Sequence, residues 1–173
     1  DITSDVVHDF RLFLSRQKGT HGEMKLVTQG YYVITCDNRP ENPGHKLADS
    51  YYNVSTTDFE GILKIAKKEK IDGILAYGTD PAAPIAAWVA EKMDLPGNSY
   101  ESVITLSDKG KFRTFLTKNK FPVPEFGIFN CYDDAWAFYK YLNRNVYVKP
   151  VDSSGSKGIT RLYPGEDLKN AYN

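Results

Sequence analysis

The residues best placed to do chemistry lie in one stretch of small and basic side chains that follows residue 148. Lys149 ends a run of β-branched and aromatic residues that predicts a strand. Backbone amides, hydroxyls and an ammonium group in one loop are the donors that a polyphosphate needs, and glycine lets the backbone approach it closely. The stretch therefore predicts a phosphate-binding loop. Its candidate ligands are Lys149, Ser153, Ser154, Gly155, Ser156, Lys157 and Gly158.

This loop does not match the common phosphate-binding motifs. The pattern G-x-x-x-x-G-K-[ST] needs a glycine five residues before a Gly-Lys pair, but Gly155 is followed by Ser156 and Pro150 occupies the first position. Residues 159–162 predict a strand, whereas that motif is followed by a helix. The remaining interpretation is a strand–loop–strand hairpin that folds over phosphates. The alternative is a flexible surface loop whose lysines face solvent.

The elements expected before this loop alternate between strands and helices. Apolar runs predict strands over residues 31–36, 51–54 and 71–76, and amphipathic patterns predict helices over residues 59–66 and 81–93. Strands and helices in this order predict a parallel sheet with crossover helices, which is the architecture of an α/β domain. In such sheets, ligands bind at the carboxyl ends of the strands.

Three polar residues at these predicted strand ends are candidates for substrate binding. Asp37 follows the first strand, and Thr79 and Asp80 follow the third. The alternative is that they only cap helices and form turns, because loops and binding sites use the same residue types.

Residues 1–29 are atypical for such a domain. An apolar pattern at helical spacing predicts an amphipathic helix around residues 6–14, with no strand before it. Residues 24–27 predict a short strand, but the few residues before the next strand leave no room for a crossover helix of about ten residues. A sheet without its first strand has open edges, which could drive formation of a homodimer or strand exchange.

The pattern changes after residue 97, where we place a domain boundary. Residues 98–173 predict a mixed α+β unit. Its helices are expected over residues 100–106, 108–116 and 133–142, and its strands over residues 126–129, 146–149 and 159–162.

Three segments together are similar to one known family. Residues 148–159 resemble its phosphate-covering loop, and residues 108–116, followed by Phe121-Pro-Val-Pro124, resemble the run that opens its catalytic domain. Residues 30–37 with Ala48-Asp49 resemble the domain that precedes it. The family is the ATP-grasp superfamily, and the nearest branch is the carbamoyl-phosphate-synthase-like and carboxylate–amine ligase branch.

The resemblance implies a fold and a site. Residues 1–97 would form a Rossmann-like pre-ATP-grasp domain with a parallel sheet, and residues 98–173 the first part of the ATP-grasp domain, an α+β subdomain. Lys109 and Lys149 would contact the nucleotide phosphates, and residues 153–158 would close over the β- and γ-phosphates.

The resemblance also implies an activity. Such a ligase uses ATP to turn a carboxylate into an acyl phosphate, which an amine or another nucleophile then attacks. The family's Mg²⁺ ligands lie beyond the loop and are expected outside this chain, so we expect the 173-residue chain alone to be inactive. ATP and a small carboxylate are the expected partners.

The composition of the chain bears on its other possible partners and on its cellular compartment. The chain has 22 Lys and Arg against 22 Asp and Glu, which argues against a general nucleic-acid surface. No apolar run approaches the roughly 20 residues of a membrane span, so no membrane partner is expected. Cys36 and Cys131 lie far apart and fit a reducing cytoplasm.

No catalytic and no metal-ligating residue is assigned from the sequence. The three histidines are isolated and have no nearby ligand partners. The alternative to a ligase is a non-catalytic Rossmann-like module that binds a ligand or a partner chain.

Overall fold

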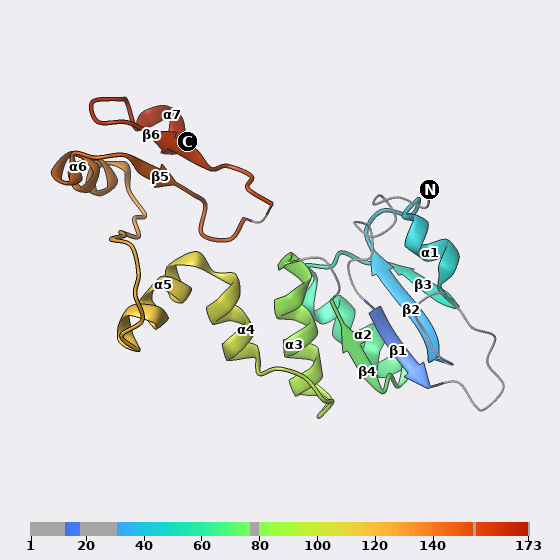
Figure 1. Cartoon of the computed structure of the whole chain (residues 1–173). Helices are drawn as coiled ribbons and strands as arrows, with labels where there is room; N and C mark the ends of the chain where they lie inside the picture. The colour runs from blue at the N-terminus through green and yellow to red at the C-terminus, as the bar shows by residue number, and fades with distance from the viewer. Residues whose placement is uncertain (1–12, 18–30, 77–79, 154, 173) are drawn as a thin grey trace, which may run out of the picture. The chain divides into compact units, whose positions relative to one another are not determined.

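The structure is a computed structural model that describes residues 13–17, 31–76, 80–153 and 155–172. The chain divides into two compact units, Asp1–Ser107 and Asp108–Asn173 (Figure 1). The sequence predicted a boundary near residue 97. Helix α4 (Tyr100–Ser107) belongs to the first unit, where the backbone N–H of Tyr100 donates to Glu91 Oε1 at 2.6 Å and helix α4 packs against helix α3 (Ala83–Lys92).

The first unit is built on a four-stranded sheet in the order β3-β2-β1-β4 (Figure 1). The strands are β1 (Phe13–Gln17), β2 (Tyr31–Asp37), β3 (Ser50–Asn53) and β4 (Gly73–Leu75). Strands β2 and β3 are parallel, but β1 runs antiparallel to both of its neighbours. The α/β class is confirmed, whereas the prediction of an entirely parallel sheet is wrong at β1.

Strand β1 also corrects the helix predicted around residues 6–14. Phe13 pairs with Thr35 on one side and with Leu75 on the other, so β1 completes two ladders of backbone hydrogen bonds. Those ladders satisfy far more backbone groups than the end of a marginal helix would, so tertiary pairing overrides the local pattern. An antiparallel neighbour also needs no crossover helix, which removes the spacing problem. The rest of the predicted helix and the strand predicted over residues 24–27 lie outside the described residues.

Helix α2 (Phe59–Glu69) and helix α3 supply the core of the first unit. Successive strand residues point to opposite faces, and Ile34 and Cys36 of β2 join the cluster that contains Ile62 and Val89. The short helix α1 (Pro43–Leu47) contacts β2 through a 2.7 Å hydrogen bond between Thr35 Oγ1 and His45 Nδ1. The 3₁₀ turn η1 (Asp80–Ala82) leads into α3.

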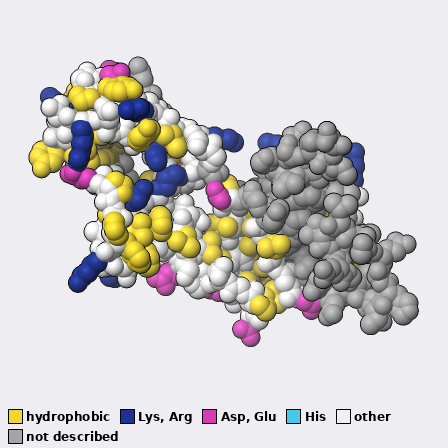
Figure 2. All heavy atoms as spheres, in the orientation of Figure 1, with side chains coloured by type: hydrophobic (Ala, Val, Ile, Leu, Met, Phe, Trp, Pro, Cys, Tyr) yellow, Lys and Arg dark blue, Asp and Glu magenta, His cyan; other side chains and the backbone are white. Residues whose placement is uncertain are grey.

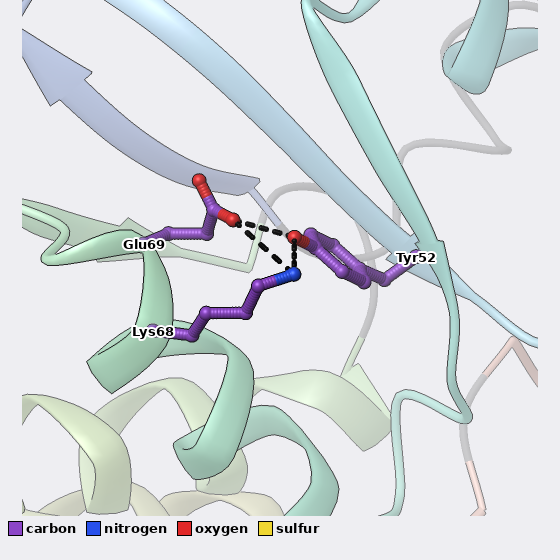
Figure 3. Close-up of polar contacts among 3 residues, drawn as sticks. All are labelled: Tyr52, Lys68 and Glu69. Carbon is purple, nitrogen blue, oxygen red and sulfur yellow. Dashed lines mark hydrogen bonds and ion pairs between the residues drawn. The ribbon is translucent and has the colours of Figure 1, made fainter.

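A polar cluster ties the edge strand β3 to the end of helix α2 (Figure 3). The Tyr52 hydroxyl donates to Glu69 Oε1 at 2.5 Å and accepts a hydrogen bond from Lys68 Nζ at 2.9 Å. The Lys68 ammonium also lies 4.9 Å from the centre of the Tyr52 ring. An edge strand presents unpaired backbone groups, and this cluster fixes its position against the helix.

In the second unit, helices α6 (Tyr132–Leu142) and α7 (Lys169–Tyr172) pack against a two-stranded hairpin (Figure 1). Helix α5 (Lys109–Lys118) comes before α6, and the hairpin consists of strands β5 (Val146–Val148) and β6 (Thr160–Leu162). A separate core forms around Ala135 and Tyr139 of α6 with Leu162 and Leu168.

The strand predicted over residues 126–129 is wrong. These residues are not assigned to any strand, and the described part of the chain offers them no ladder partner. Ile128 instead lies against helix α5, where a Cβ on Gly110 would come within 2.9 Å of Ile128 Cδ1. Residues 126–129 therefore have a sequence pattern typical of a strand, but Ile128 packs on a helix instead.

Candidate functional site

The phosphate loop predicted from the sequence connects β5 to β6, and its base is closed by Pro150 and Gly158. Strands β5 and β6 are antiparallel, with Val148 opposite Thr160. A Cβ on Gly158 would lie 2.8 Å from Pro150 Cγ, so only glycine allows this approach. The prediction of a strand–loop–strand hairpin is confirmed.

The tip of this loop follows a left-handed path. Gly155 has φ = 63° and Ser156 has φ = 59°, so two consecutive residues adopt the conformation that glycine favours. Gly155, Ser156 and Lys157 are exposed, while Ser153 is half-buried. Ser153 Oγ donates to the backbone carbonyl of Lys157 at 3.1 Å, across the turn. Ser154 lies outside the described residues.

Lys109 meets this loop from the start of helix α5, although 44 residues separate it from Ser153. Asp108 caps the helix and accepts a hydrogen bond from the Lys111 N–H at 2.7 Å. The Lys109 N–H donates to the Val151 carbonyl at 2.9 Å, and its Nζ donates to the Ser153 carbonyl. The fold therefore brings together two of the sequence-predicted site segments.

Lys149 lies at the exposed end of β5, beside an aromatic and basic strand face that the sequence analysis missed. Its Nζ is 5.8 Å from the centre of the Tyr147 ring, and Arg161 Cζ is 6.0 Å from the same ring and 4.7 Å from the Tyr163 ring. Residues 147 and 149, and residues 161 and 163, alternate along their strands, so the period of two in the sequence was the available signal.

Among the described residues, the cations of this site form no ion pair. Within the described residues, none of the ion pairs joins a carboxylate to Lys149, Lys157 or Arg161, whereas Arg144 in the same unit pairs with Glu125. Unpaired cations beside a loop rich in backbone donors are suited to an anionic ligand.

The neutral total charge hides an asymmetry between the two units. Residues 108–173 carry eleven Lys and Arg against seven Asp and Glu, whereas residues 1–107 carry eleven against fifteen. The second unit is therefore net positive by four charges. Figure 2 shows Lys and Arg side chains interspersed with hydrophobic ones on its visible face.

The residues predicted to bind substrate at the strand ends of the first unit differ from one another in burial and in hydrogen bonding. Asp37 is 1% exposed, and its carboxylate accepts hydrogen bonds from the Arg39 N–H at 2.9 Å and from Asn42 Nδ2 at 3.0 Å. Asn42 in turn caps helix α1. Asp80 is exposed in η1, and Thr79 lies outside the described residues. The described contacts do not join Asp37 to Asp80.

The described residues show neither a metal centre nor a membrane span. No group of three or more His, Cys, Asp or Glu side chains is arranged to hold a metal ion in that part of the chain. None of the helices described there combines the length and hydropathy needed to cross a bilayer.

Similar proteins were found both by sequence and by structure. The arginine-specific large chain of carbamoyl phosphate synthase from Bacillus subtilis is 32% identical over 150 residues, which are 81% of this chain and 14% of that protein. Phosphoribosylamine–glycine ligase from Methanopyrus kandleri is 34% identical over 133 residues, 75% of this chain and 29% of that protein.

The similarity extends to a solved structure. The biotin carboxylase domain dimer of the Hydrogenobacter thermophilus 2-oxoglutarate carboxylase, in complex with MgADP, ADP and bicarbonate, has a TM-score of 0.62 at 22% identity. It covers 80% of this chain and 34% of that one. The chain belongs to the ATP-grasp superfamily.

This ATP-grasp chain is shorter than the proteins that it resembles. It spans about a seventh of the carbamoyl phosphate synthase large chains, 14% of their length. No family model matches it. The relatives agree with the branch predicted from the loop and from residues 108–124.

Proposed function

We propose that this chain is the ATP-binding portion of an ATP-grasp ligase that activates a carboxylate as an acyl phosphate for attack by an amine or another nucleophile. The observation that carries the proposal is the meeting of Lys109 with the loop that follows Lys149. Two separate sequence segments bring the Lys109 ammonium group together with the hydroxyls and glycine backbone of the loop, which suits a polyphosphate.

The proposed roles of the residues follow from this arrangement. Lys109 and Lys149 neutralise the phosphates, and residues 153–158 close over the β- and γ-phosphates. The exposed Tyr147 ring beside Lys149 offers a surface against which a nucleobase can stack. Positioning and charge neutralisation account for most of the catalysis of phosphoryl transfer, so a site of this composition can promote it without a protein nucleophile.

The described residues fit the nucleotide better than the metal. They offer cations and hydrogen-bond donors, but no cluster of carboxylates lies among them for Mg²⁺. Mg²⁺, when bound with ATP, would offset the charge of the phosphates, and its protein ligands are expected outside this chain. We assign no catalytic residue here.

The substrate, localisation and oligomeric state complete the proposal. A small carboxylate would bind near the strand ends that carry Asp37, Thr79 and Asp80. Cys36 and Cys131 are free thiols, which fits the cytoplasm. Two copies could associate through exposed strand edges.

Calorimetric titration of the 173-residue chain with ATP tests the nucleotide site. We expect Lys149→Ala to weaken ATP binding about tenfold or more, since a charge-assisted hydrogen bond to phosphate is lost. Lys111→Ala is the matched control, because Lys111 is an exposed lysine of helix α5. The affinity of the Lys111→Ala chain for ATP should stay within about twofold of the wild-type value.

Two results would overturn the proposal. Equal affinities of the wild type and Lys149→Ala would remove Lys149 from the site. A wild-type chain that is not stabilised thermally by millimolar ATP would favour a non-catalytic binding module, because a ligand that binds only the folded state must raise its stability.

A further inference from the structure

One face of the hairpin formed by β5 and β6 carries aromatic and cationic side chains in a fixed order away from the phosphate loop. Tyr147 lies opposite Arg161 in the hairpin register. Lys149 is the next residue on this face toward the loop, about 7 Å along the chain, and Tyr163 is the next in the other direction. Tyr147 is 61% exposed and Tyr163 is 48% exposed, and both cations are exposed as well.

The Arg161 guanidinium lies toward the end of this face that is remote from the loop. Its Cζ is 4.7 Å from the centre of the Tyr163 ring and 6.0 Å from the centre of the Tyr147 ring. Lys149 Nζ is 5.8 Å from the centre of the Tyr147 ring. A ligand that extends from Lys149 along this face therefore meets the Tyr147 ring and then the guanidinium.

The fold anchors the ring that lies closest to Arg161. The Tyr139 hydroxyl donates to the Tyr163 carbonyl, which also accepts the Glu166 N–H at 3.1 Å. The Tyr163 N–H donates to Glu166 Oε2 at 2.8 Å, and the preceding residue, Leu162, is buried in the core of the second unit. Cation–π contact with an anchored ring restricts the guanidinium, so less conformational entropy is lost when a ligand binds it.

The N–H donors of Arg161 are available to a ligand. In the described part of the second unit, Arg161 forms no ion pair, whereas Arg144 pairs with Glu125. A guanidinium both packs on aromatic faces and donates to planar groups of acceptor atoms. Beside the exposed Tyr147 ring, it is suited to a planar ring system that carries acceptors.

We propose that Arg161 binds the nucleoside half of the nucleotide whose phosphates contact Lys149 and the phosphate loop, and that it thereby makes the site distinguish a nucleotide from a bare polyphosphate. A nucleobase beside Tyr147 offers the guanidinium both a π face and acceptor atoms. The geometry favours this role over a phosphate contact, because the guanidinium lies nearer to Tyr163 than to Tyr147. The inference rests on the proposed function, since it takes the ligand to be a nucleotide with its phosphates at Lys149.

Calorimetric titration of the 173-residue chain with ATP and with inorganic triphosphate tests this role. Arg161→Met should weaken ATP binding about tenfold, because a cation–π contact and a hydrogen bond are lost. Its affinity for triphosphate should stay within about twofold of the wild-type value at physiological ionic strength, where salt screens a distant charge. Lys149→Ala should weaken the binding of both ligands. Arg144→Met is the matched control and should weaken neither.

Arg161→Lys is a second variant, which keeps the positive charge on β6 and removes only the planar group. We expect it to bind ATP at least about fivefold more weakly than the wild type, because an ammonium group does not reproduce the stacking and the paired donors of a guanidinium. Full ATP affinity in Arg161→Lys would overturn the contact between the guanidinium and the nucleobase.

The remaining outcomes separate this inference from the proposed function. Equal losses of affinity for ATP and triphosphate in Arg161→Met would place Arg161 at the phosphates and overturn the nucleoside role. Unchanged ATP binding in both Arg161 variants would overturn it as well. In these cases the wild-type chain still binds ATP, and the proposed function stands. A wild-type chain that binds neither ligand would overturn the proposed function and this inference together.

Discussion

The Pro150 ring lies directly against the backbone of Gly158, with Cγ 2.8 Å from the place that a Cβ on Gly158 would occupy. Gly155, in the same loop, has nothing within 4 Å of the corresponding position. Both glycines have positive φ, 69° at Gly158 and 63° at Gly155. This pair of positions separates the effect of backbone strain from the effect of contact.

We therefore expect Gly158→Ala to destabilise the chain more than Gly155→Ala. Gly155→Ala should lower the free energy of unfolding by about 1 kcal/mol, because alanine is strained in the left-handed conformation. Gly158→Ala should carry the same cost and lose about 1 kcal/mol more through overpacking against Pro150. Urea denaturation of both variants measures the difference. Replacing Pro150 with Ala in the Gly158→Ala background should recover part of the loss, and equal costs for the two glycines would contradict the packing seen at the loop base.

The Tyr52 cluster of Figure 3 should stabilise the first unit by a measurable amount. Tyr52→Phe removes the hydroxyl that bonds Glu69 and Lys68, so we expect a loss of about 1 kcal/mol in the free energy of unfolding. Tyr51→Phe is the matched control, because Tyr51 is 53% exposed and its hydroxyl makes no hydrogen bond among the described residues. Its effect should stay within about 0.5 kcal/mol.

Tyr52→Phe should also lower the pKa of the Lys68 amine. The hydrogen bond donated to Tyr52 is the main cause that raises the pKa of the Lys68 amine above its ordinary value, because it favours the charged form. In Tyr52→Phe the pKa should fall back, which NMR titration of the lysine side chain can follow. A Lys68 pKa that is the same in Tyr52→Phe and in the wild type would rule out the hydroxyl as the cause.

The two cysteines should react at very different rates. Cys36 is 1% exposed, and burial, with a smaller contribution from the charge of Asp37, raises its pKa to about 12. Cys131 is exposed at the start of helix α6. At pH 8 we expect a thiol reagent to modify Cys131 in the native chain and Cys36 only after unfolding, because the thiolate is the reactive form. Cys131→Ser should then leave no fast-reacting thiol, and rapid labelling of that variant would contradict the burial of Cys36.

The raised pKa of Cys36 also makes stability depend on pH in the alkaline range. Below pH 9 the thiol is protonated in both states, and between about pH 9 and 12 it ionises only in the unfolded chain. The unfolded state then binds fewer protons, so the free energy of unfolding falls as pH rises, by up to about 1.4 kcal/mol per pH unit. Cys36→Ala should lose this contribution to the slope between pH 9 and 10.5, whereas Cys131→Ala should keep it.

Asp37 should act first as a structural residue. Its buried carboxylate bonds the Arg39 N–H and Asn42 Nδ2, so Asp37→Ala leaves both donors without this partner and should cost about 2 kcal/mol. Asn38→Ala, at the exposed neighbouring position, should cost less than about 0.5 kcal/mol. An Asp37→Ala chain as stable as the wild type would contradict this structural role.

Local patterns predicted the elements whose sequence and packing agree. Helix α6 and the hairpin of β5 and β6 follow directly from their apolar spacing, and the loop between them from its glycines and serines. The resemblance to a family, rather than any local pattern, singled out Lys109. Its contact with Ser153 spans 44 residues, and no pattern in either segment encodes it.

The elements that were predicted wrongly or missed depend on contacts between segments that are distant in the sequence. Strand β1 was predicted as part of a helix because the pairing that decides its state lies in β2 and β4. Residues 126–129 read as a strand because the periodicity of the sequence does not say whether a partner strand exists. Arg161 and Tyr147 were missed because their proximity depends on the register of the hairpin, which only the folded chain fixes.

The separate cores of the two units give each of them its own fluorescent reporter. The chain has two tryptophans, and Trp88 packs on the core of the first unit while Trp136 packs on that of the second. A Trp88→Phe chain would report by emission on the unit that carries the phosphate loop, and a Trp136→Phe chain on the sheet unit. Coincident or staggered emission transitions in denaturant would then reveal whether the halves melt as one cooperative body or one after the other.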